Sequence, residues 1–206
     1  SNKEKILAAY INYSLEQEAA PKSVYKFCKA AKIKEDTFYK NFKNLHQLPK
    51  LFWKELLHKS FKIAQEHNSE ETSSAEMLLN FYYVLIENLN LNRSYILFSL
   101  EGKSFTQLLK SIRPEAVKIL GEINNSFKPL EPLSEDLSRL ASREALFAQF
   151  AGVMKFWSND ESSDSEKTEA FIEKSVKVLD DINIDIPVSS LLDFGKFIIG
   201  ELKSFR

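Results

Sequence analysis

The sequence predicts an all-α protein. Only five glycines and six prolines occur in 206 residues, which is few for the turns that sheets require. Long segments repeat apolar residues every three or four positions, the period of a helix that buries one face. A serine followed three residues later by glutamate or glutamine, the pattern of a helix capping box, occurs at Ser73, Ser104 and Ser163. We therefore expect a string of helices.

Residues 23–42 predict two short helices joined by a tight turn. Apolar residues recur at three and four positions from Val24 to Ala31, and Phe38 and Phe42 repeat this spacing in the second helix. Helices this short need a third helix on which to pack. The preceding segment can form it, with Ile6, Leu7, Tyr10, Ile11 and Tyr13 on its apolar face. The pattern is typical of a DNA-binding helix-turn-helix.

The charge distribution agrees with a DNA-binding N-terminal part. The net charge of the whole chain is −1. Residues 1–60 contain 12 lysines and six acidic residues, a net charge of +6, so the remainder carries −7. Lysines often serve only to solvate a surface. Because the basic excess coincides with a helix-turn-helix pattern, it favours nucleic acid as the partner.

Over residues 4–48 the sequence resembles the tetracycline-repressor (TetR) family of bacterial transcription regulators. The resemblance rests on Ile6-Leu7-Ala8-Ala9, on the capping Ser23, on the turn Ala31-Lys32-Ile33, and on Thr37-Phe38-Tyr39-Lys40-Asn41-Phe42 with Leu48. Two positions depart from the family pattern. Lys32 stands where the family turn has glycine, and Leu45 stands where the family places a lysine, although Lys43 is two residues away.

The resemblance implies a DNA-binding domain over residues 1–48 and a helical dimerisation and ligand-binding domain over 49–206. Its partners would be double-stranded DNA with a palindromic operator, a second copy of the chain and a small apolar ligand. Base edges and phosphates would be contacted by the second helix of the pair, and the DNA backbone also by flanking residues. The residues expected at DNA are Ser23, Lys34, Glu35, Thr37, Tyr39, Lys40, Asn41 and Lys43.

Two acidic residues, Glu35 and Asp36, begin the expected recognition helix. Negative charge at a helix N-terminus contributes about 0.3–1 kcal/mol through the helix dipole. At DNA, however, the same carboxylates face phosphates. Either Glu35 accepts a hydrogen bond from a cytosine amino group and contributes specificity, or both acids simply lower affinity.

Beyond residue 48 the apolar period predicts further helices. We expect them near 47–61, 77–91, 95–98, 104–125, 136–157, 166–182 and 187–205, with Pro114 kinking or splitting the fourth of these. The polar, acidic loop 158–165 is short, so the helices on either side should form an antiparallel hairpin.

Both helices of this hairpin present two apolar stripes, and one stripe of each needs a partner. The arrangement is similar to the TetR-family dimer, in which the last two family helices of each subunit form a four-helix bundle. The residues expected at the dimer interface are Phe150, Met154, Trp157, Phe171 and Val178.

Aromatic residues of the C-terminal part could line a ligand cavity, although such stripes more often form a core. The residues in question are Phe81, Tyr82, Phe98, Phe105, Phe147 and Phe150. Arg143 with Glu144 could anchor a polar ligand in that cavity, or could be a solvated charge pair. Sensing of a ligand follows from the family resemblance alone.

Enzymatic interpretations find little support in the sequence. It contains no glycine-rich phosphate loop, no cysteine pair, no strand-turn-helix around a serine nucleophile and one Glu-x-x-His sequence at Glu55–His58, so we expect neither catalysis nor a metal or other cofactor. No apolar run of 18 residues and no signal peptide is present, and the single Cys28 suits a reducing cytoplasm.

The sequence therefore predicts a cytoplasmic, homodimeric, ligand-responsive DNA-binding repressor. Two alternatives belong to other classes of protein. One is a degenerate regulator that serves as a protein-interaction module, and the other is a helical-bundle carrier of lipids or small molecules.

Overall fold

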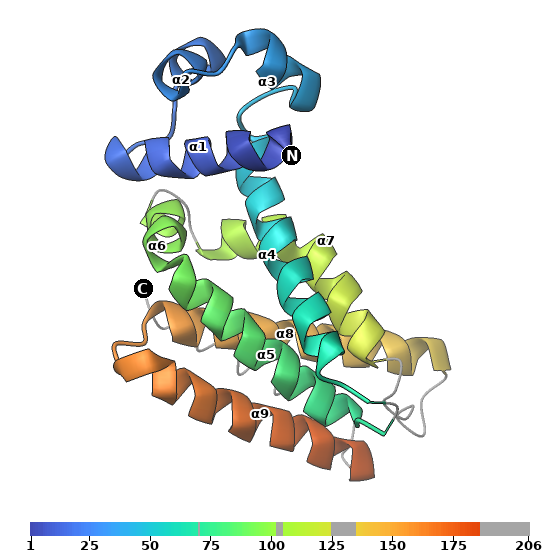
Figure 1. Ribbon diagram of the computed structural model, residues 1–206. Helices are drawn as coiled ribbons and strands as arrows, with labels where there is room; N and C mark the ends of the chain where they lie inside the picture. Colours follow the sequence, from blue (N-terminus) through green and yellow to red (C-terminus); the bar gives the residue numbers. More distant parts are fainter. Residues whose placement is uncertain (70, 102–104, 125–134, 186–206) are drawn as a thin grey trace. The chain divides into compact units, whose positions relative to one another are not determined.

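The computed structural model describes residues 1–69, 71–101, 105–124 and 135–185, and all regular elements in these ranges are helical. The predicted all-α fold is therefore confirmed (Figure 1). The helices are α1 (Asn2–Glu16), α2 (Val24–Ala31), α3 (Glu35–Asn41), α4 (Gln47–Glu66), α5 (Ser74–Leu91), α6 (Arg93–Glu101), α7 (Phe105–Asn124), α8 (Glu135–Ser158) and α9 (Glu166–Asp185), with a short 3-10 helix at Ser163–Ser165.

The chain divides into two compact units. Unit 1 contains Ser1–Leu57 and Leu91–Ile112, and unit 2 contains His58–Asn90 and Arg113–Arg206. Helices α4 and α7 therefore contribute residues to both units. In unit 1, α1 contacts α2, α3 and α6.

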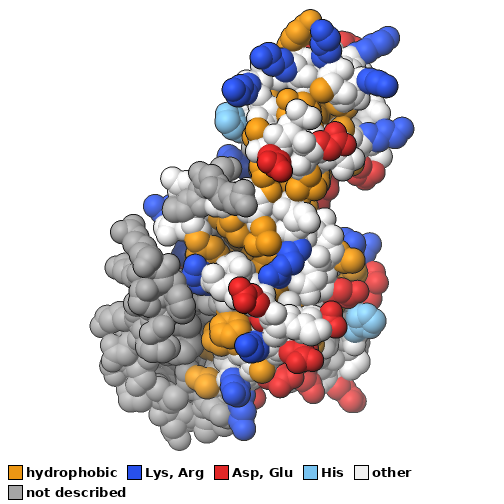
Figure 2. Space-filling model, turned by 90° about the vertical axis from the view of Figure 1, so that its left-hand side faces the viewer, with side chains coloured by type: hydrophobic (Ala, Val, Ile, Leu, Met, Phe, Trp, Pro, Cys, Tyr) orange, Lys and Arg blue, Asp and Glu red, His pale blue; other side chains and the backbone are white. Residues whose placement is uncertain are grey.

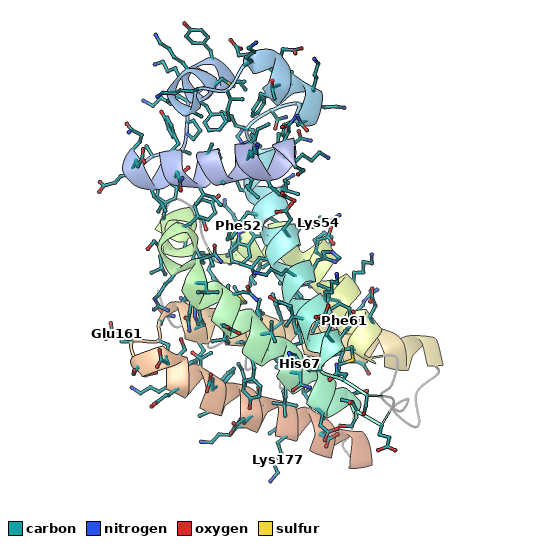
Figure 3. The ribbon with its side chains drawn as sticks, in the orientation of Figure 1. Phe52, Lys54, Phe61, His67, Glu161 and Lys177 are labelled. Atoms are coloured by element: carbon teal, nitrogen blue, oxygen red, sulfur yellow. The ribbon has the colours of Figure 1, made fainter. Side chains whose placement is uncertain are left out.

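Unit 1 has an aromatic core. Phe27 and Phe38 are fully buried, as the helical spacing predicted, and their ring centroids lie 6.1 Å apart. Tyr10 of α1 contacts Phe27 edge to face at 6.0 Å, so the first helix does provide the packing surface. On the other side of α1, Phe52 of α4 lies 4.7 Å from the ring of Tyr95 in α6 (Figure 3).

Unit 2 contains the predicted antiparallel hairpin of α8 and α9 (Figure 1). Gln149 of α8 donates to Ser175 Oγ of α9 over 3.0 Å, and Gln149 Oε1 also accepts from the buried Tyr82 hydroxyl of α5 over 3.1 Å. Farther along α5, the Asn88 amide donates to Ser60 Oγ of α4, and Asn90 Oδ1 accepts from the indole N–H of Trp157. Polar side chains thus connect α5 to α4 and α8.

Two of the predicted helix starts can be compared with the structure. The capping box of Ser73 and Glu76 is confirmed, because each residue's amide donates to the other's side chain, over 2.8 and 3.2 Å. The box predicted at Ser163 is wrong. The amide groups at the start of α9 donate instead to Asp160 and Ser162, which precede the 3-10 helix. Ser104 and the helix expected at 187–205 lie outside the described residues.

Helix α7 continues through Pro114, so the expected split of this helix does not occur. The residues next to the proline form ion pairs with other helices. Arg113 donates twice to Glu144 of α8, at 2.6 and 2.7 Å, while Glu115 pairs with His58 of α4 at 2.7 Å. The partner of Glu144 is thus Arg113 rather than its sequence neighbour Arg143, because side chains at consecutive helix positions point in different directions.

Candidate nucleic-acid interface

Backbone and capping hydrogen bonds fix the two ends of α2 in the helix-turn-helix. Ser23 precedes α2 in an extended conformation, and its Oγ accepts from the amide of Lys26 at 3.3 Å. At the other end Lys32 adopts a left-handed conformation with φ 54°, and the amide of Ile33 donates to the Cys28 carbonyl over 2.9 Å. This is the hydrogen bond of a Schellman motif, which turns the chain sharply toward α3.

Lys32 occupies a backbone conformation that glycine adopts without cost, whereas a side chain costs about 1 kcal/mol there. We therefore expect Lys32→Gly to raise the free energy of unfolding of unit 1 by about 1 kcal/mol. The matched control is Lys29→Gly, which places glycine inside α2 and should be destabilising by a similar amount. Thermal unfolding measures both variants, and a lower melting temperature for Lys32→Gly would contradict this account of the turn.

Packing inside unit 1 leaves one face of α3 exposed. Phe38 is buried against Phe27, and Phe42, just after α3, is 6% exposed, which fixes the rotation of the helix. Residues expected at DNA then lie mainly on the surface. Lys34, Glu35, Tyr39, Lys40 and Lys43 are exposed, while Ser23, Thr37 and Asn41 are half-buried.

Hydrogen bonds already engage part of this set. The Asn41 side-chain amide donates to the Thr37 carbonyl over 2.8 Å, and Ser23 Oγ is used by the helix cap. The backbone amide of Lys43 donates to Gln47 Oε1 over 2.6 Å, which connects the segment after α3 to the start of α4. These contacts orient the side chains, and Asn41 Oδ1 and the hydroxyl proton of Ser23 still offer an acceptor and a donor.

The electrostatics of this surface are predominantly basic. Exposed lysines occur on α2, in the turn and around α3, and Figure 2 shows blue side chains spread around this part of the molecule. They are Lys22, Lys26, Lys29, Lys32, Lys34, Lys40 and Lys43. Burial raises the pKa of the nearby Cys28 thiol, and the negative charge of Glu35 raises it further, so this buried cysteine stays protonated.

An ion pair lies on the exposed surface of α3. The ammonium group of Lys40 is 2.7 Å from the carboxylate of Asp36, and both side chains are 71% exposed. The spacing of four residues places the two on one helix face. Sequence reasoning considered Asp36 and Lys40 separately, although their spacing alone would have indicated the pair.

Another exposed residue that sequence reasoning did not include is Tyr25 of α2, which is 60% exposed. It lies between Lys22 and Lys26 in the sequence, and Tyr39 of α3 is 54% exposed. The signal was available, because Tyr25 falls outside the apolar face defined by Val24 and Phe27. An exposed aromatic ring with a hydroxyl among lysines can contact a phosphate or a sugar.

The residues expected to bind a ligand are divided between the two units. Phe98 and Phe105 belong to unit 1 and are half-buried. The other four belong to unit 2, where Phe81, Tyr82 and Phe150 are fully buried and Phe147 is half-buried. Arg113 lies over the ring of Phe147, 4.3 Å from its centre.

The residues expected at the dimer interface differ in exposure. Phe150, Met154 and Trp157 are at most 1% exposed, so within this single chain they belong to the core of unit 2. Val178 is 43% exposed and Phe171 is half-buried. Phe156, which sequence reasoning did not include, is 39% exposed and stacks on Phe171 with 5.0 Å between ring centres.

Among the described helices none combines the length and the apolar composition needed to cross a membrane. Within the described ranges no three His, Cys, Asp or Glu side chains are grouped as metal ligands would be.

Comparison with known proteins identifies a family for the C-terminal part of the chain. Residues 77–198, more than half of the chain, match the family model described as "Tetracyclin repressor-like, C-terminal domain". Searches of curated proteins and of solved structures gave no match. The match covers most of α5 and everything after it up to residue 198, and is therefore independent of the helix-turn-helix residues.

Proposed function

Because the chain belongs to the tetracycline-repressor family of transcription regulators, we propose that it is a cytoplasmic, homodimeric repressor that binds a palindromic operator and is released by a small apolar ligand. Members of this family are regulators rather than enzymes. The observation that carries the proposal is the exposed, lysine-rich face of α2 and α3 on a buried aromatic core. It supplies the two things a DNA-binding module needs, a rigid recognition helix and positive charge around it.

The proposed DNA-binding domain covers residues 1–48, and the remainder would dimerise and bind the ligand. Recognition helices of a dimer have to lie about 34–36 Å apart to enter successive major grooves. Thr37, Lys40 and Asn41 would contact base edges or nearby phosphates, and Ser23, Tyr39 and Lys43 would hold the DNA backbone. A ligand that binds another spacing of the two α3 helices more tightly would shift the dimer away from DNA.

The first test is DNA binding itself. We expect genomic fragments to bind with a strong salt dependence, with a slope of about −0.9 per phosphate neutralised. Lys40→Ala should weaken binding to the cognate site about tenfold, in the range of one charged contact. The matched control is Lys177→Ala, since Lys177 projects from α9 into solvent (Figure 3) and should leave binding unchanged. Gel-shift titrations at several salt concentrations measure these effects.

Substitution of Glu35, at the start of α3, is the second part of this test. Glu35→Gln removes a negative charge that would face phosphates. It should therefore strengthen binding to non-specific DNA and reduce the ratio of cognate to non-specific affinity. If neither the native chain nor a variant with Glu35→Gln and Asp36→Asn shows salt-sensitive binding to any genomic fragment, the helix-turn-helix does not bind DNA. The interaction-module alternative would then replace the repressor.

The proposed dimer uses the accessible apolar residues of the α8–α9 hairpin. Phe171 and Val178 are seven positions apart and so share one face of α9, beside Phe156. We expect a two-fold dimer in solution, and Phe156→Glu with Val178→Glu should give monomers because the charges would be buried at the interface. Lys118→Glu on α7 adds an exposed acid as the control. Light scattering that found a native monomer at micromolar concentration would exclude this dimer.

A further inference from the structure

The centre of the exposed face of α3 is occupied by the ion pair of Asp36 and Lys40. Two positions along an α-helix correspond to a rotation of about 200°. Asp36 and Lys40 each lie two positions from Phe38, which is fully buried, so both lie on the face opposite the core. Because α3 has only seven residues, few other side chains share this face. When α3 enters a major groove, this pair faces the base edges, and Thr37 and Asn41 lie to its sides.

The pair retains hydrogen-bonding capacity that its mutual contact does not use. A carboxylate accepts several hydrogen bonds and an ammonium group donates three. With 2.7 Å between them, the two groups present an acceptor and a donor side by side. Each also compensates the other's charge, so neither enters the groove as an unpaired ion, which would be costly to desolvate.

Of the four base pairs, G·C complements this arrangement best. In the major groove a G·C pair presents the guanine O6 and N7 acceptors beside the cytosine N4 donor. O6 and N4 are hydrogen-bonded to each other, and so lie about 2.9 Å apart, close to the separation within the ion pair. A T·A pair also places an acceptor, thymine O4, beside a donor, adenine N6. It offers the ammonium group one acceptor instead of two, however, and the thymine methyl group crowds that acceptor.

We propose that Asp36 and Lys40 act together to read one G·C base pair in each operator half-site, with Lys40 donating to guanine and Asp36 accepting from cytosine N4. This assignment rests on the proposed function and specifies which sequence the recognition helix prefers. It also explains an acid at the centre of a DNA-binding surface. Asp36 lowers affinity for DNA in general and favours sites that supply a donor to it.

The test is selection of binding sites from a random double-stranded library with the full-length chain and two variants. For the native protein we expect a G·C pair at one position of each half-site, and its replacement should weaken binding about 5- to 150-fold. Exchange of the two residues, Asp36→Lys with Lys40→Asp, keeps the intrahelical pair but reverses donor and acceptor. This variant should select C·G at the same position. Asp36→Asn should select T·A, with adenine in the place of cytosine, because asparagine pairs with adenine N6 and N7.

The outcomes separate the inference from the proposed function. If all three proteins select the same sequence, or if the native protein selects A·T or T·A at this position, the pair only stabilises α3 and the inference is wrong while the protein remains a DNA-binding regulator. If the native chain enriches no sequence at low salt, the proposed function fails and this inference fails with it. The melting temperatures of the variants show that they are folded, since both positions are largely exposed.

Discussion

Phe27→Ala should lower the free energy of unfolding of unit 1 by about 3–5 kcal/mol, the usual cost of removing a buried phenylalanine ring. Phe27 is fully buried and contacts three other rings, those of Tyr10, Tyr13 and Phe38. Loss of this ring removes the surface on which α3 packs. We therefore expect the proposed sequence-specific DNA binding to be lost together with stability, although no side chain of the proposed DNA-binding face is changed.

Hydrogen exchange of the α2 and α3 amides measures this effect directly, because it reports the local opening of unit 1. The matched control lies two residues earlier in the same helix. Tyr25→Ala removes a ring that is 60% exposed and should change stability by less than about 1 kcal/mol. Equal protection of α3 in Phe27→Ala and Tyr25→Ala would show that the aromatic core does not hold the recognition helix.

Asp160→Asn should lower the free energy of unfolding by about 2–3 kcal/mol at neutral pH. The Asp160 carboxylate is 6% exposed and accepts four hydrogen bonds, two each from Ser162 and Thr168, over 2.6–2.8 Å. An asparagine oxygen can accept only half of these, and its amino group faces donors. The amide and hydroxyl of the buried Thr168 would then lack a good acceptor.

The same group predicts a pH dependence. Burial raises the pKa of Asp160, but the hydrogen bonds from Ser162 and Thr168 outweigh this effect and lower its pKa from 3.8 to about 2. A carboxyl whose pKa is lower in the folded state stabilises the fold above its unfolded pKa, and this stabilisation is lost as the pH falls from about 4 to 2. The difference between native protein and Asp160→Asn should therefore shrink over this interval. Denaturant titrations at pH 7 and pH 3 measure it.

The control for this prediction is Asp164→Asn in the same loop. Asp164 is exposed and has a φ of 50°, a conformation that asparagine tolerates as well as aspartate. We expect little change in its stability or in the pH profile. If the native protein and Asp160→Asn lose the same amount of stability between pH 4 and pH 2, the capping hydrogen bonds contribute nothing to stability.

Local patterns in the sequence predicted the described helices and the buried core of the helix-turn-helix. The spacing of Phe27, Phe38 and Phe42 identified residues that are buried, and Ser23 predicted the cap that α2 has. The turn was also foreshadowed, since a position where the family motif has glycine favours a left-handed conformation, and Lys32 adopts it. All these features depend on residues within a few positions of one another, where the period of the helix determines which side chains meet.

Contacts between distant segments were not predictable. The cap of α9 comes from Asp160, eight residues before Thr168, and the partner of Glu144 is 31 residues away. The apolar stripes of α8 were interpreted as one core face and one interface, yet Phe150 and Met154 are both buried in the chain. Helical periodicity shows which residues share a face. How many neighbouring helices cover that face depends on the whole fold.

The polar side chains of α5 determine how this helix can move. An apolar helix surface can slide along its neighbour, because one methyl group replaces another as a contact. Tyr82, Asn88 and Asn90, by contrast, each have a hydrogen-bonding partner on α4 or α8. A shift of one turn, about 5.4 Å, would break all three and leave polar groups without partners in the core, at about 1–3 kcal/mol each. Helix α5 is therefore fixed in one register, so that a bound molecule can displace it only together with the α4 and α8 segments to which it is hydrogen-bonded.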